Sequence, residues 1–350
     1  PVLSMTMHDG IVLQSDRFKK SLASADQSDY KVVEYGKLVI GFPIDEGVLY
    51  IQKVAPEGIM SPAYSTWDVD TTRINPDFLE LCLHSPQSMQ YYKDKLRSTT
   101  ARRRSIPTAD LLALRIRTPD MESQLEAVAV ARKVDEMIAI RHAQATLLDQ
   151  LVKSRFIELF GDPMTNPKGF PCYTVGEVID FQGGSQPDKK YFEYESTPDN
   201  IRLIQIRDYK SDKYITYIPR AMAKRFCTAD DIMVGRYGPP IFQILKGIEG
   251  SFNVALMKAT PKMGNREFAR QFLKQDCLLE YLEGLSKRTA GQDGIQMDKL
   301  KAYPFPYPPI ELQEQFAAFV EQVDKSKLAV QQGLKELEIL KKSLMQQYFG

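Results

Sequence analysis

The sequence predicts an α+β protein built as an internal repeat. We expect two mixed, strand-rich domains separated by two long antiparallel helices, which form a coiled-coil spacer with a pseudo-two-fold relation between the two halves. Three observations predict this fold: a repeat at a constant spacing, two helical segments of about 40 residues, and short strand patterns elsewhere. A repeat of this length indicates the duplication of one structural unit.

The repeat pairs the carboxy-terminal part of the chain with its middle, without a gap. Phe160-Gly161 recurs as Phe349-Gly350, 189 residues later. Other matches at this spacing include Leu96 with Leu285, Thr100-Ala101 with Thr289-Ala290, Leu111 with Leu300, Pro119 with Pro308, Gln124 with Gln313, Val134-Asp135 with Val323-Asp324, and Lys153-Ser154 with Lys342-Ser343. We therefore expect a first domain over residues 1–118, a first long helix over 119–161, a second domain over 162–307 and a second long helix over 308–350.

The two helical segments are unusually long. The first runs from Asp120 to about Leu159 without Pro or Gly, and the second from about Ile310 to Tyr348 with a single Gly333. At 1.5 Å per residue each is about 58 Å long. Since helices of globular domains average 10–14 residues, we expect a coiled coil.

A spacing of three and four residues marks the expected helix seam. The seam residues are Val134, Ile138, Ala145, Leu148, Val152 and Leu159 in the first helix, and Val323, Val330, Leu334, Leu337, Leu344 and Tyr348 in the second. Arg141, Arg155, Lys327 and Lys341 fall on the same lines, so we expect either local register shifts or charged ends that extend past buried stems. The helices must be antiparallel, because the first leads from domain one to domain two and the second starts at domain two.

Strands are expected in both domains. The patterns are Val32 to Ile40, Leu203 to Ile206, Asp231 to Val234 and Asn253 to Met257. Short helices are expected at Pro76 to Leu83 and Arg266 to Leu273. Outside their shared carboxy-terminal thirds the two domains diverge, although Gly58 to Ala63 resembles Gly250 to Ala255. Two domains that share a scaffold and differ in their loops favour two binding specificities on one frame.

Composition excludes several classes of protein. Of the 350 residues, 43% are hydrophobic and 26% charged, and no apolar run approaches the roughly 20 residues of a membrane span. The four cysteines are widely separated and there are only three histidines, so we expect reduced thiols, no metal site and no disulfide framework. A net charge of +1 does not exclude nucleic acid, because acidic helices can offset a basic face.

Basic residues gather where the two copies correspond, and they are the candidate nucleic-acid contacts. Arginine suits phosphates and the guanine edge, and Gln suits adenine. The candidates are Arg97, Arg102, Arg103 and Arg104 in the first domain, Lys287, Arg288 and Gln292 in the second, and Lys189, Lys190, Arg207, Arg236 and Tyr237 in three segments that mix basic with aromatic residues.

We expect no catalytic residue in this chain. Gly238-Pro239-Pro240-Ile241-Phe242 is similar to the Asn/Asp-Pro-Pro-aromatic loop of amino-methyltransferases, but Gly238 replaces the polar residue that would bind the amine. No glycine-rich cofactor loop, phosphate loop or nucleophile elbow is present, and Pro187 to Lys190 has no carboxylate and lysine partner in nuclease spacing.

The whole pattern resembles the specificity (S) subunits of type I restriction-modification systems. The residues that carry the resemblance are Glu158 to Pro163, which spell Glu-Leu-Phe-Gly-Asp-Pro, Tyr173 to Val178 at the opening of the second domain, and Ile310 to Gln315 with its counterpart Met121 to Gln124. The doubled architecture together with the Phe-Gly-Asp-Pro ending is the specific part of this signal.

The resemblance implies a non-catalytic subunit that recognises a bipartite site in double-stranded DNA, one domain for each half-site, with the helices setting the distance between the halves. It implies two modification (methyltransferase) subunits as partners, which would hold S-adenosylmethionine, as well as restriction subunits. We expect no cofactor in this chain, no membrane association, and the cytoplasm of a prokaryotic cell as its location.

Two alternatives remain open at the level of sequence. One is a degenerate stand-alone DNA methyltransferase, and the other is a coiled-coil interaction protein without a DNA role. The chain also departs from the family pattern, because Cys172 to Asp199 has no counterpart in the first domain and residue 1 aligns near Arg202-Leu203. We expect either an amino-terminal truncation or a shortened first domain.

Overall fold

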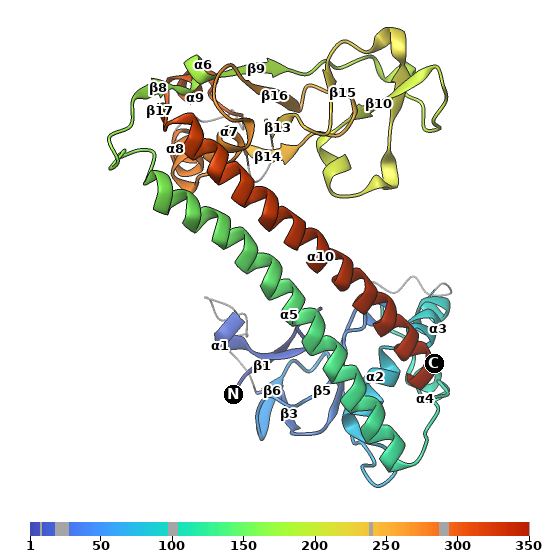
Figure 1. Cartoon of the computed structure of the whole chain (residues 1–350). Helices are drawn as coiled ribbons and strands as arrows, with labels where there is room; N and C mark the ends of the chain where they lie inside the picture. The colour runs from blue at the N-terminus through green and yellow to red at the C-terminus, as the bar shows by residue number, and fades with distance from the viewer. Residues whose placement is uncertain (8, 18–27, 97–103, 238–240, 287–293, 350) are drawn as a thin grey trace. The chain divides into compact units, whose positions relative to one another are not determined.

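The structure is a computed structural model that describes residues 1–7, 9–17, 28–96, 104–237, 241–286 and 294–349. It consists of two compact units. Unit 1 holds residues 1–144 and 330–350, and unit 2 holds residues 145–329. Both boundaries fall inside the long helices α5 (Met121–Phe160) and α10 (Ile310–Phe349), so each unit combines one domain with one half of either helix (Figure 1).

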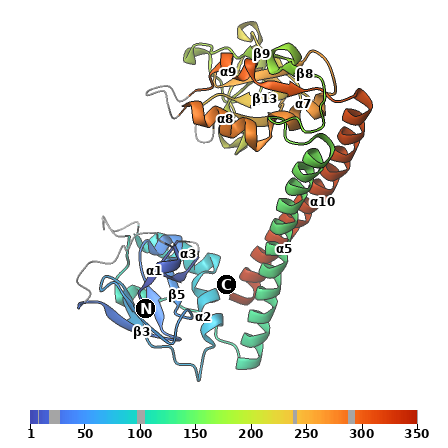
Figure 2. The same cartoon turned by 90° about the vertical axis from the view of Figure 1, so that its left-hand side faces the viewer.

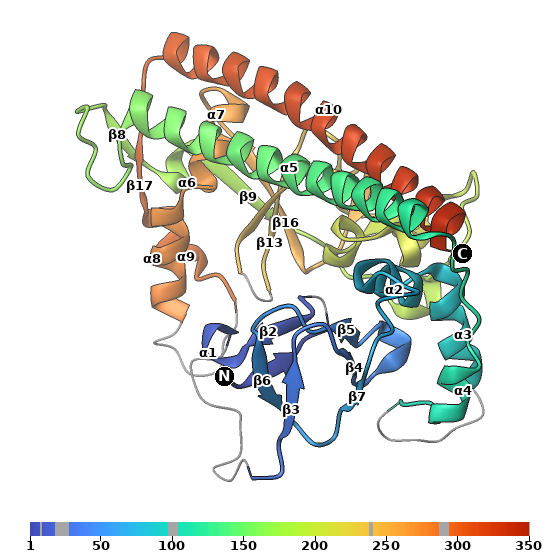
Figure 3. The same ribbon diagram turned by 90° about the horizontal axis from the view of Figure 1, so that it is seen from below.

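The described strands of unit 1 are short and mostly antiparallel (Figure 3). They are β1 (Leu3–Met5), β2 (Ile11–Leu13), β3 (Lys31–Glu34), β4 (Leu38–Ile40), β5 (Leu49–Ile51), β6 (Glu57–Met60) and β7 (Ser65–Trp67). β1 pairs with β2, β3 pairs with β6, and β4 lies between β5 and β7. Val33, Val39 and Met60 are fully buried between these sheets.

The single strand expected over residues 32–40 is wrong, because a turn divides it into β3 and β4. Gly36 has a φ of 86°, which a strand cannot contain, and its N–H donates to the carbonyl of Gln52 at 2.8 Å. Gln52 is itself fully buried, and its side-chain oxygen accepts from the N–H of Val54. The turn is therefore fixed by contacts that are distant in sequence.

The described helices of unit 1 outside α5 and α10 are α1 (Gln14–Arg17), α2 (Pro76–Leu83), α3 (Pro86–Leu96) and α4 (Thr108–Leu112). Helix α2 has the bounds expected from the sequence. Asn75 caps it, because its side-chain oxygen accepts from the N–H groups of Asp77 and Phe78. α2 packs through Phe78 on the start of α5 and the end of α10.

Unit 2 contains two four-stranded sheets and one two-stranded sheet among its described residues (Figure 2). The strands are β8 (Cys172–Thr174), β9 (Ile179–Gly183), β10 (Asn200–Ile204), β11 (Tyr217–Pro219), β12 (Phe226–Cys227), β13 (Ile232–Gly235), β14 (Gln243–Lys246), β15 (Gly250–Phe252), β16 (Leu256–Pro261) and β17 (Pro304–Pro306). The sheet orders are β11-β10-β15-β12, β14-β13-β16-β9 and β17-β8, and all pairs are antiparallel except β10 with β15.

Two strand predictions in unit 2 are wrong at both ends, since β10 covers Asn200–Ile204 where 203–206 was expected, and β16 covers Leu256–Pro261 where 253–257 was expected. β10 stops at Ile204, because the side chain of Asp208 accepts from the N–H of Gln205 and starts a 3-10 helix, η3 (Ile206–Tyr209). β16 starts only at Leu256, because the side chain of Asn253 accepts from the N–H of Ala255 and forms a turn. In both cases a short polar side chain competes with the strand for backbone hydrogen bonds.

The other described helices of unit 2 are α6 (Val175–Val178), α7 (Arg266–Leu273), α8 (Asp276–Ser286) and α9 (Met297–Ala302). A capping box joins Thr174 and Glu177 at the start of α6. Phe268 of α7 packs on the rings of Phe156 and Phe160 from α5, and both of these rings also contact Phe316 from α10. α7 is thereby fixed to the ends of the long helices that belong to unit 2.

The same joint between short and long helix occurs in both units. In unit 1 the buried side chain of Gln124 accepts from the N–H of Asn75 at 2.8 Å, and in unit 2 Gln313 accepts from the N–H of Asn265 at 2.9 Å. The ring of Phe349 packs at a tilt against Phe78 in unit 1, and the ring of Phe160 packs edge-on against Phe268 in unit 2. The repeat seen in the sequence is thus a repeat of specific tertiary contacts.

The halves of α5 and α10 pair antiparallel within each unit. Lys341 forms an ion pair with Asp135 in unit 1, and Lys327 forms one with Asp149 in unit 2, both at 2.5 Å. All of the seam residues expected from the sequence are buried or partly buried: Val134, Ile138, Ala145, Leu148, Val152, Leu159, Val323, Val330, Leu334, Leu337, Leu344 and Tyr348. The two lysines extend past the seam to reach the facing helix, as expected.

The first residues of unit 1 correspond to β10 of unit 2. Val2 forms a parallel bridge with Ile59, and Leu203 pairs in parallel with Ser251. Glycine occupies the same place next to both pairs, since Gly58 pairs with Val33 and Gly250 with Cys227. β8, α6 and β9 have no counterpart among the residues that the structure describes in unit 1.

Candidate nucleic-acid interface

Arg207 lies exposed on η3, where β10 ends. Its guanidinium donates to the hydroxyl of Thr216 at 3.0 Å and lies 6.0 Å from the ring centre of Tyr214. Thr216 is fully buried, whereas 57% of Tyr214 is exposed. The side chain of Arg207 is therefore held by the hydroxyl of Thr216 and the ring of Tyr214, while about half of it is exposed to solvent.

A buried carboxylate lies behind Arg207. Asp208 has a side chain only 1% exposed, 3.7 Å from Nε of Arg202 and 4.0 Å from Nε of Arg207. Burial raises the pKa of Asp208, against the opposing effects of the Gln205 N–H and the two arginines. Arg202 also pairs with Asp212 at the surface.

This cluster leaves several buried atoms without hydrogen bonds. Nε of Arg202, Oδ1 of Asp208 and the hydroxyl of Tyr209 have no partner among the described residues. An unpartnered buried polar atom costs about 1–3 kcal/mol. Local arrangements that lower stability in this way are typical of binding sites.

Arg236 and Tyr237 follow the end of β13, next to η3. Nη1 of Arg236 donates to the carbonyl of Val254, and its guanidinium lies 5.3 Å from the ring centre of Tyr237. A side chain at Gly235 would approach Ile206 to 2.9 Å, so the end of β13 and the start of η3 are in contact. Close packing at this glycine brings Arg236 and Arg207 to one edge of unit 2.

Lys189 and Lys190 lie on a loop that leaves β9 toward the same edge. Both are exposed, and the ammonium of Lys190 lies 5.0 Å from the ring centre of Tyr191. The loop is attached through Gln186, whose side chain accepts from Asn253 at 3.4 Å. We call residues 183–191, 205–214, 236–237 and 253–255 the loop cluster.

Of the candidates in the first domain, only Arg104 lies among the described residues. Arg104 is described, and it forms ion pairs with Asp45 at 3.0 Å and with Glu46. Arg97, Arg102 and Arg103 lie outside the described residues, as do Lys287, Arg288, Gln292 and the segment 238–240. The structure therefore describes six of the candidates, Arg104 in unit 1 and Lys189, Lys190, Arg207, Arg236 and Tyr237 in unit 2.

Two further observations concern chemistry and membranes. Among the described residues, no group of three or more His, Cys, Asp or Glu side chains is placed to hold a metal ion. In the same part of the chain, no helix is both long and apolar enough to cross a membrane.

The loop cluster lies within a segment that matches a known family. Residues 167–339 match the family described as "Type I restriction modification DNA specificity domain". This part of the chain belongs to the type I specificity family. The matched segment contains the second domain and most of α10, so the loop cluster belongs to a DNA specificity domain.

Two solved structures share the fold of this chain, and a third matches it more weakly. A chain from a structure of complex assembly and conformational transition of the type I R-M system matches with a TM-score of 0.58 and 18% identity over 93% of this chain and 84% of that one. The S subunit from M. genitalium matches with a TM-score of 0.51 and 14% identity over 91% and 84%. The HsdS subunit from Thermoanaerobacter tengcongensis matches with 0.40 and 19% over 93% and 83%.

Sequence reasoning named Arg207 as a candidate and missed the residues that hold its side chain in place. Arg207 was a candidate because basic and aromatic residues alternate around it, but Asp208, Arg202 and Thr216 were not. A carboxylate directly after an arginine was the available signal, and a charged pair on an exposed loop usually contributes little. Only the burial of Asp208 reveals that the two residues belong to one arrangement.

Proposed function

We propose that this chain is the subunit that selects the DNA site of a type I restriction-modification complex, and that it does so as a bipartite reader. Each domain recognises one half-site, and the paired helices set the number of base pairs between the halves. In the second domain the loop cluster carries the contacts, with Arg207 and Arg236 presented to the DNA and Asp208 positioning Arg207.

The observation that carries this proposal is the duplication of one joint in both units. The Gln124–Asn75 and Gln313–Asn265 contacts hold each domain on its long helices in the same way. Two domains attached equivalently to one antiparallel pair of helices suit a site made of two separate halves. Two domains that differ in their loops suit halves of different sequence.

Partner subunits would dock on the helices. Large apolar side chains remain exposed on α5, including Met137 and Ile140 in unit 1 and Leu147 and Leu151 in unit 2. Their spacing of three, seven and four residues is that of a helix-packing stripe. We propose that two modification subunits use such surfaces and that they hold the S-adenosylmethionine and perform the adenine methylation, while restriction subunits complete the complex.

The test is to map methylated adenines in a host that lacks adenine methylation and expresses this chain with the modification subunit encoded next to it. We expect a bipartite motif with one methyladenine in each half. An unmodified genome, together with failure of the two purified proteins to form a complex, would contradict the proposal. That result would favour a coiled-coil interaction protein without a DNA role.

A further inference from the structure

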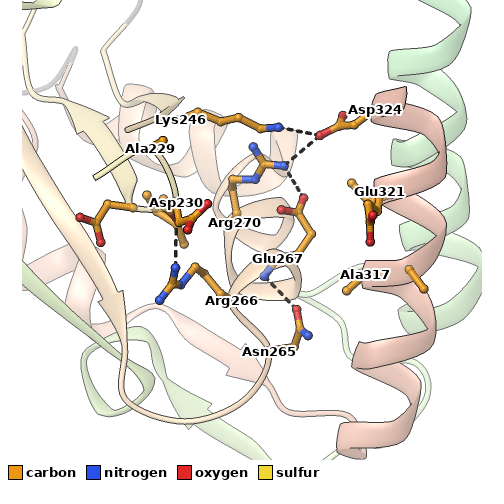
Figure 4. A pocket seen from close by; sticks show the side chains of 14 residues that line it. Ala229, Asp230, Lys246, Asn265, Arg266, Glu267, Arg270, Ala317, Glu321 and Asp324 are labelled. Atoms are coloured by element: carbon orange, nitrogen blue, oxygen red, sulfur yellow. Dashed lines mark hydrogen bonds and ion pairs between the residues drawn. The ribbon is translucent and has the colours of Figure 1, made fainter. Parts of the chain in front are cut away.

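Two neighbouring cavities lie in unit 2 where α7 and the β13–β14 hairpin meet the helices α5 and α10. Their volumes are about 600 and 520 Å³. Lys246, Arg270 and Asp324 line both of them, and Figure 4 shows these three side chains meeting beside the larger cavity. Lys246 lies 2.8 Å from Asp324, and Arg270 lies 3.5 Å from the same carboxylate.

The two cavities differ in charge. The larger is lined by Asp230, Asp231, Glu267, Glu321 and Asp324 against three cations, Lys246, Arg266 and Arg270. The smaller is lined by Lys153, Lys246, Arg270, Lys274 and Lys327 against only two carboxylates, Asp149 and Asp324. We call the smaller one the Lys274 cavity. Its lining carries an excess of positive charge.

The ion-pair partners of these cations do not cancel the excess of positive charge in the lining of the Lys274 cavity. Lys327 pairs with Asp149, and Lys246 pairs with Asp324, which uses both carboxylates of the lining. Lys153 pairs with Asp276, which lies outside the lining. The side chain of Lys274 has no hydrogen bond or ion pair with any described residue.

Arg270 adds a second unpaired donor. The residue is only 7% exposed, and one of its terminal nitrogens donates to Glu267 at 2.7 Å. Its Nε is buried and has no hydrogen-bond partner in the part of the chain that the structure describes. A buried donor without an acceptor is rare, and a missing anionic ligand is one physical explanation for it.

The surrounding protein and the neighbouring cations lower the pKa of Lys274. The residue is exposed, yet desolvation by the protein, together with the charges of Arg270 and Lys327, lowers the pKa of its ammonium group. An anion that binds beside such a lysine stabilises its charged form. Lysine supplies a point charge and arginine a directed donor, and both suit phosphate oxygens.

We propose that the Lys274 cavity binds a phosphate group. The phosphate belongs either to a free ion or nucleotide or to the DNA backbone, and in the second case the inference rests on the proposed function. This site is made by the base of the domain and the long helices, and no residue of the loop cluster lines it.

The first experiment measures the reactivity of lysines in the full chain with acetic anhydride, read by mass spectrometry, with and without inorganic phosphate or pyrophosphate. We expect either anion to slow acetylation of Lys274 several-fold, because the bound anion raises its pKa. The exposed Lys299 on α9 serves as the control, and its rate should not change. Equal rates for Lys274 with and without millimolar pyrophosphate would overturn the proposal.

Matched variants separate the sources of the phosphate. Lys274→Gln should abolish the rise in melting temperature that pyrophosphate causes, and Lys299→Gln should retain it. If the ligand is DNA, duplex should protect Lys274 from acetylation, and Lys274→Gln should reduce the salt dependence of DNA binding by about one ion. Protection by pyrophosphate alone assigns the site to a free phosphate. Failure of the proposed function would instead appear as absent DNA binding with the pyrophosphate effect intact.

Discussion

Arg207 and its surroundings show how one residue can be prepared for recognition. Thr216 accepts from its guanidinium, and Asp208 lies buried behind it. Because these contacts hold the side chain in place, less conformational entropy would be lost if Arg207 binds DNA as proposed. An arginine held in this way suits the bidentate contact with guanine O6 and N7.

Replacement of Arg207 tests its role as a base-reading residue. We expect Arg207→Ala to weaken binding by about 1–3 kcal/mol and to relax specificity at one position of one half-site, with the other half-site unchanged. Arg207→Lys should relax the same position, since lysine lacks the planar fork. The measurement is the methylated motif of each variant, with Lys299→Ala as control. Uniform weakening across all positions would instead assign Arg207 to a phosphate.

At the scale of elements, each domain is attached to its long helices by a buried glutamine. Gln124 and Gln313 are fully buried, and each accepts from the N–H of the asparagine that caps a short helix. Their removal leaves that N–H without an acceptor. We expect Gln313→Ala and Gln124→Ala each to lower the free energy of unfolding by about 1–3 kcal/mol.

Chemical denaturation measures this loss. Gln315→Ala is the matched control, because Gln315 is exposed on the same helix and its replacement should change stability by less than about 0.5 kcal/mol. Equal stability of Gln313→Ala and Gln315→Ala would show that the buried glutamine is not a structural anchor.

The ion pairs at the two joints carry opposite charges at corresponding places, with the acid on the short helix in unit 1 and on the long helix in unit 2. In unit 1, Asp77 on α2 pairs with Arg132 on α5, and in unit 2, Arg270 on α7 pairs with Asp324 on α10. Partial burial alone would raise the pKa of Asp324, but Lys246, Arg270 and Lys327 hold it below its usual range. Burial would also raise the pKa of Asp77, but Lys53 and Arg132 outweigh this effect and lower the pKa.

A lowered carboxylate pKa predicts a loss of stability in acid. The stabilisation is complete above the unfolded pKa, about 3.9 for aspartate, and is lost as pH falls toward the lower folded value. We expect the melting temperature to fall as the pH drops below about 4, and to fall less in Asp324→Asn and Asp77→Asn than in the wild type. Asp298→Asn, at an exposed position on α9, should follow the wild type. Identical pH profiles for all four proteins would contradict this assignment.

Sequence reasoning succeeded where local pattern decides the structure and failed where distant contacts decide it. The expected bounds of α2 and α7 match the structure, where a capping asparagine starts each helix locally, and the long helices followed from the absence of proline. The turn at Gly36 depends on Gln52, and η3 depends on the burial of Asp208. The Lys274 cavity combines residues from α5, β14, α7 and α10, which no spacing in the sequence brings together.

At the scale of the whole molecule, the central feature is the duplication of one unit, a domain with its parts of two antiparallel helices. The Asp135–Lys341 and Asp149–Lys327 ion pairs lie two heptads apart on either helix, so both units use the same register between α5 and α10. A register of this kind permits a length change that keeps both domain joints intact. The proposed spacer role can therefore be tested apart from half-site recognition.

The most direct test deletes one heptad from each long helix, residues 138–144 of α5 together with the facing residues 332–338 of α10, and maps the methylated motif. Seven residues shorten each helix by about 10 Å, which corresponds to roughly three base pairs at 3.4 Å per base pair. We predict that both half-sites keep their sequence while the spacer between them shortens. Altered half-site sequences with an unchanged spacer would contradict the account.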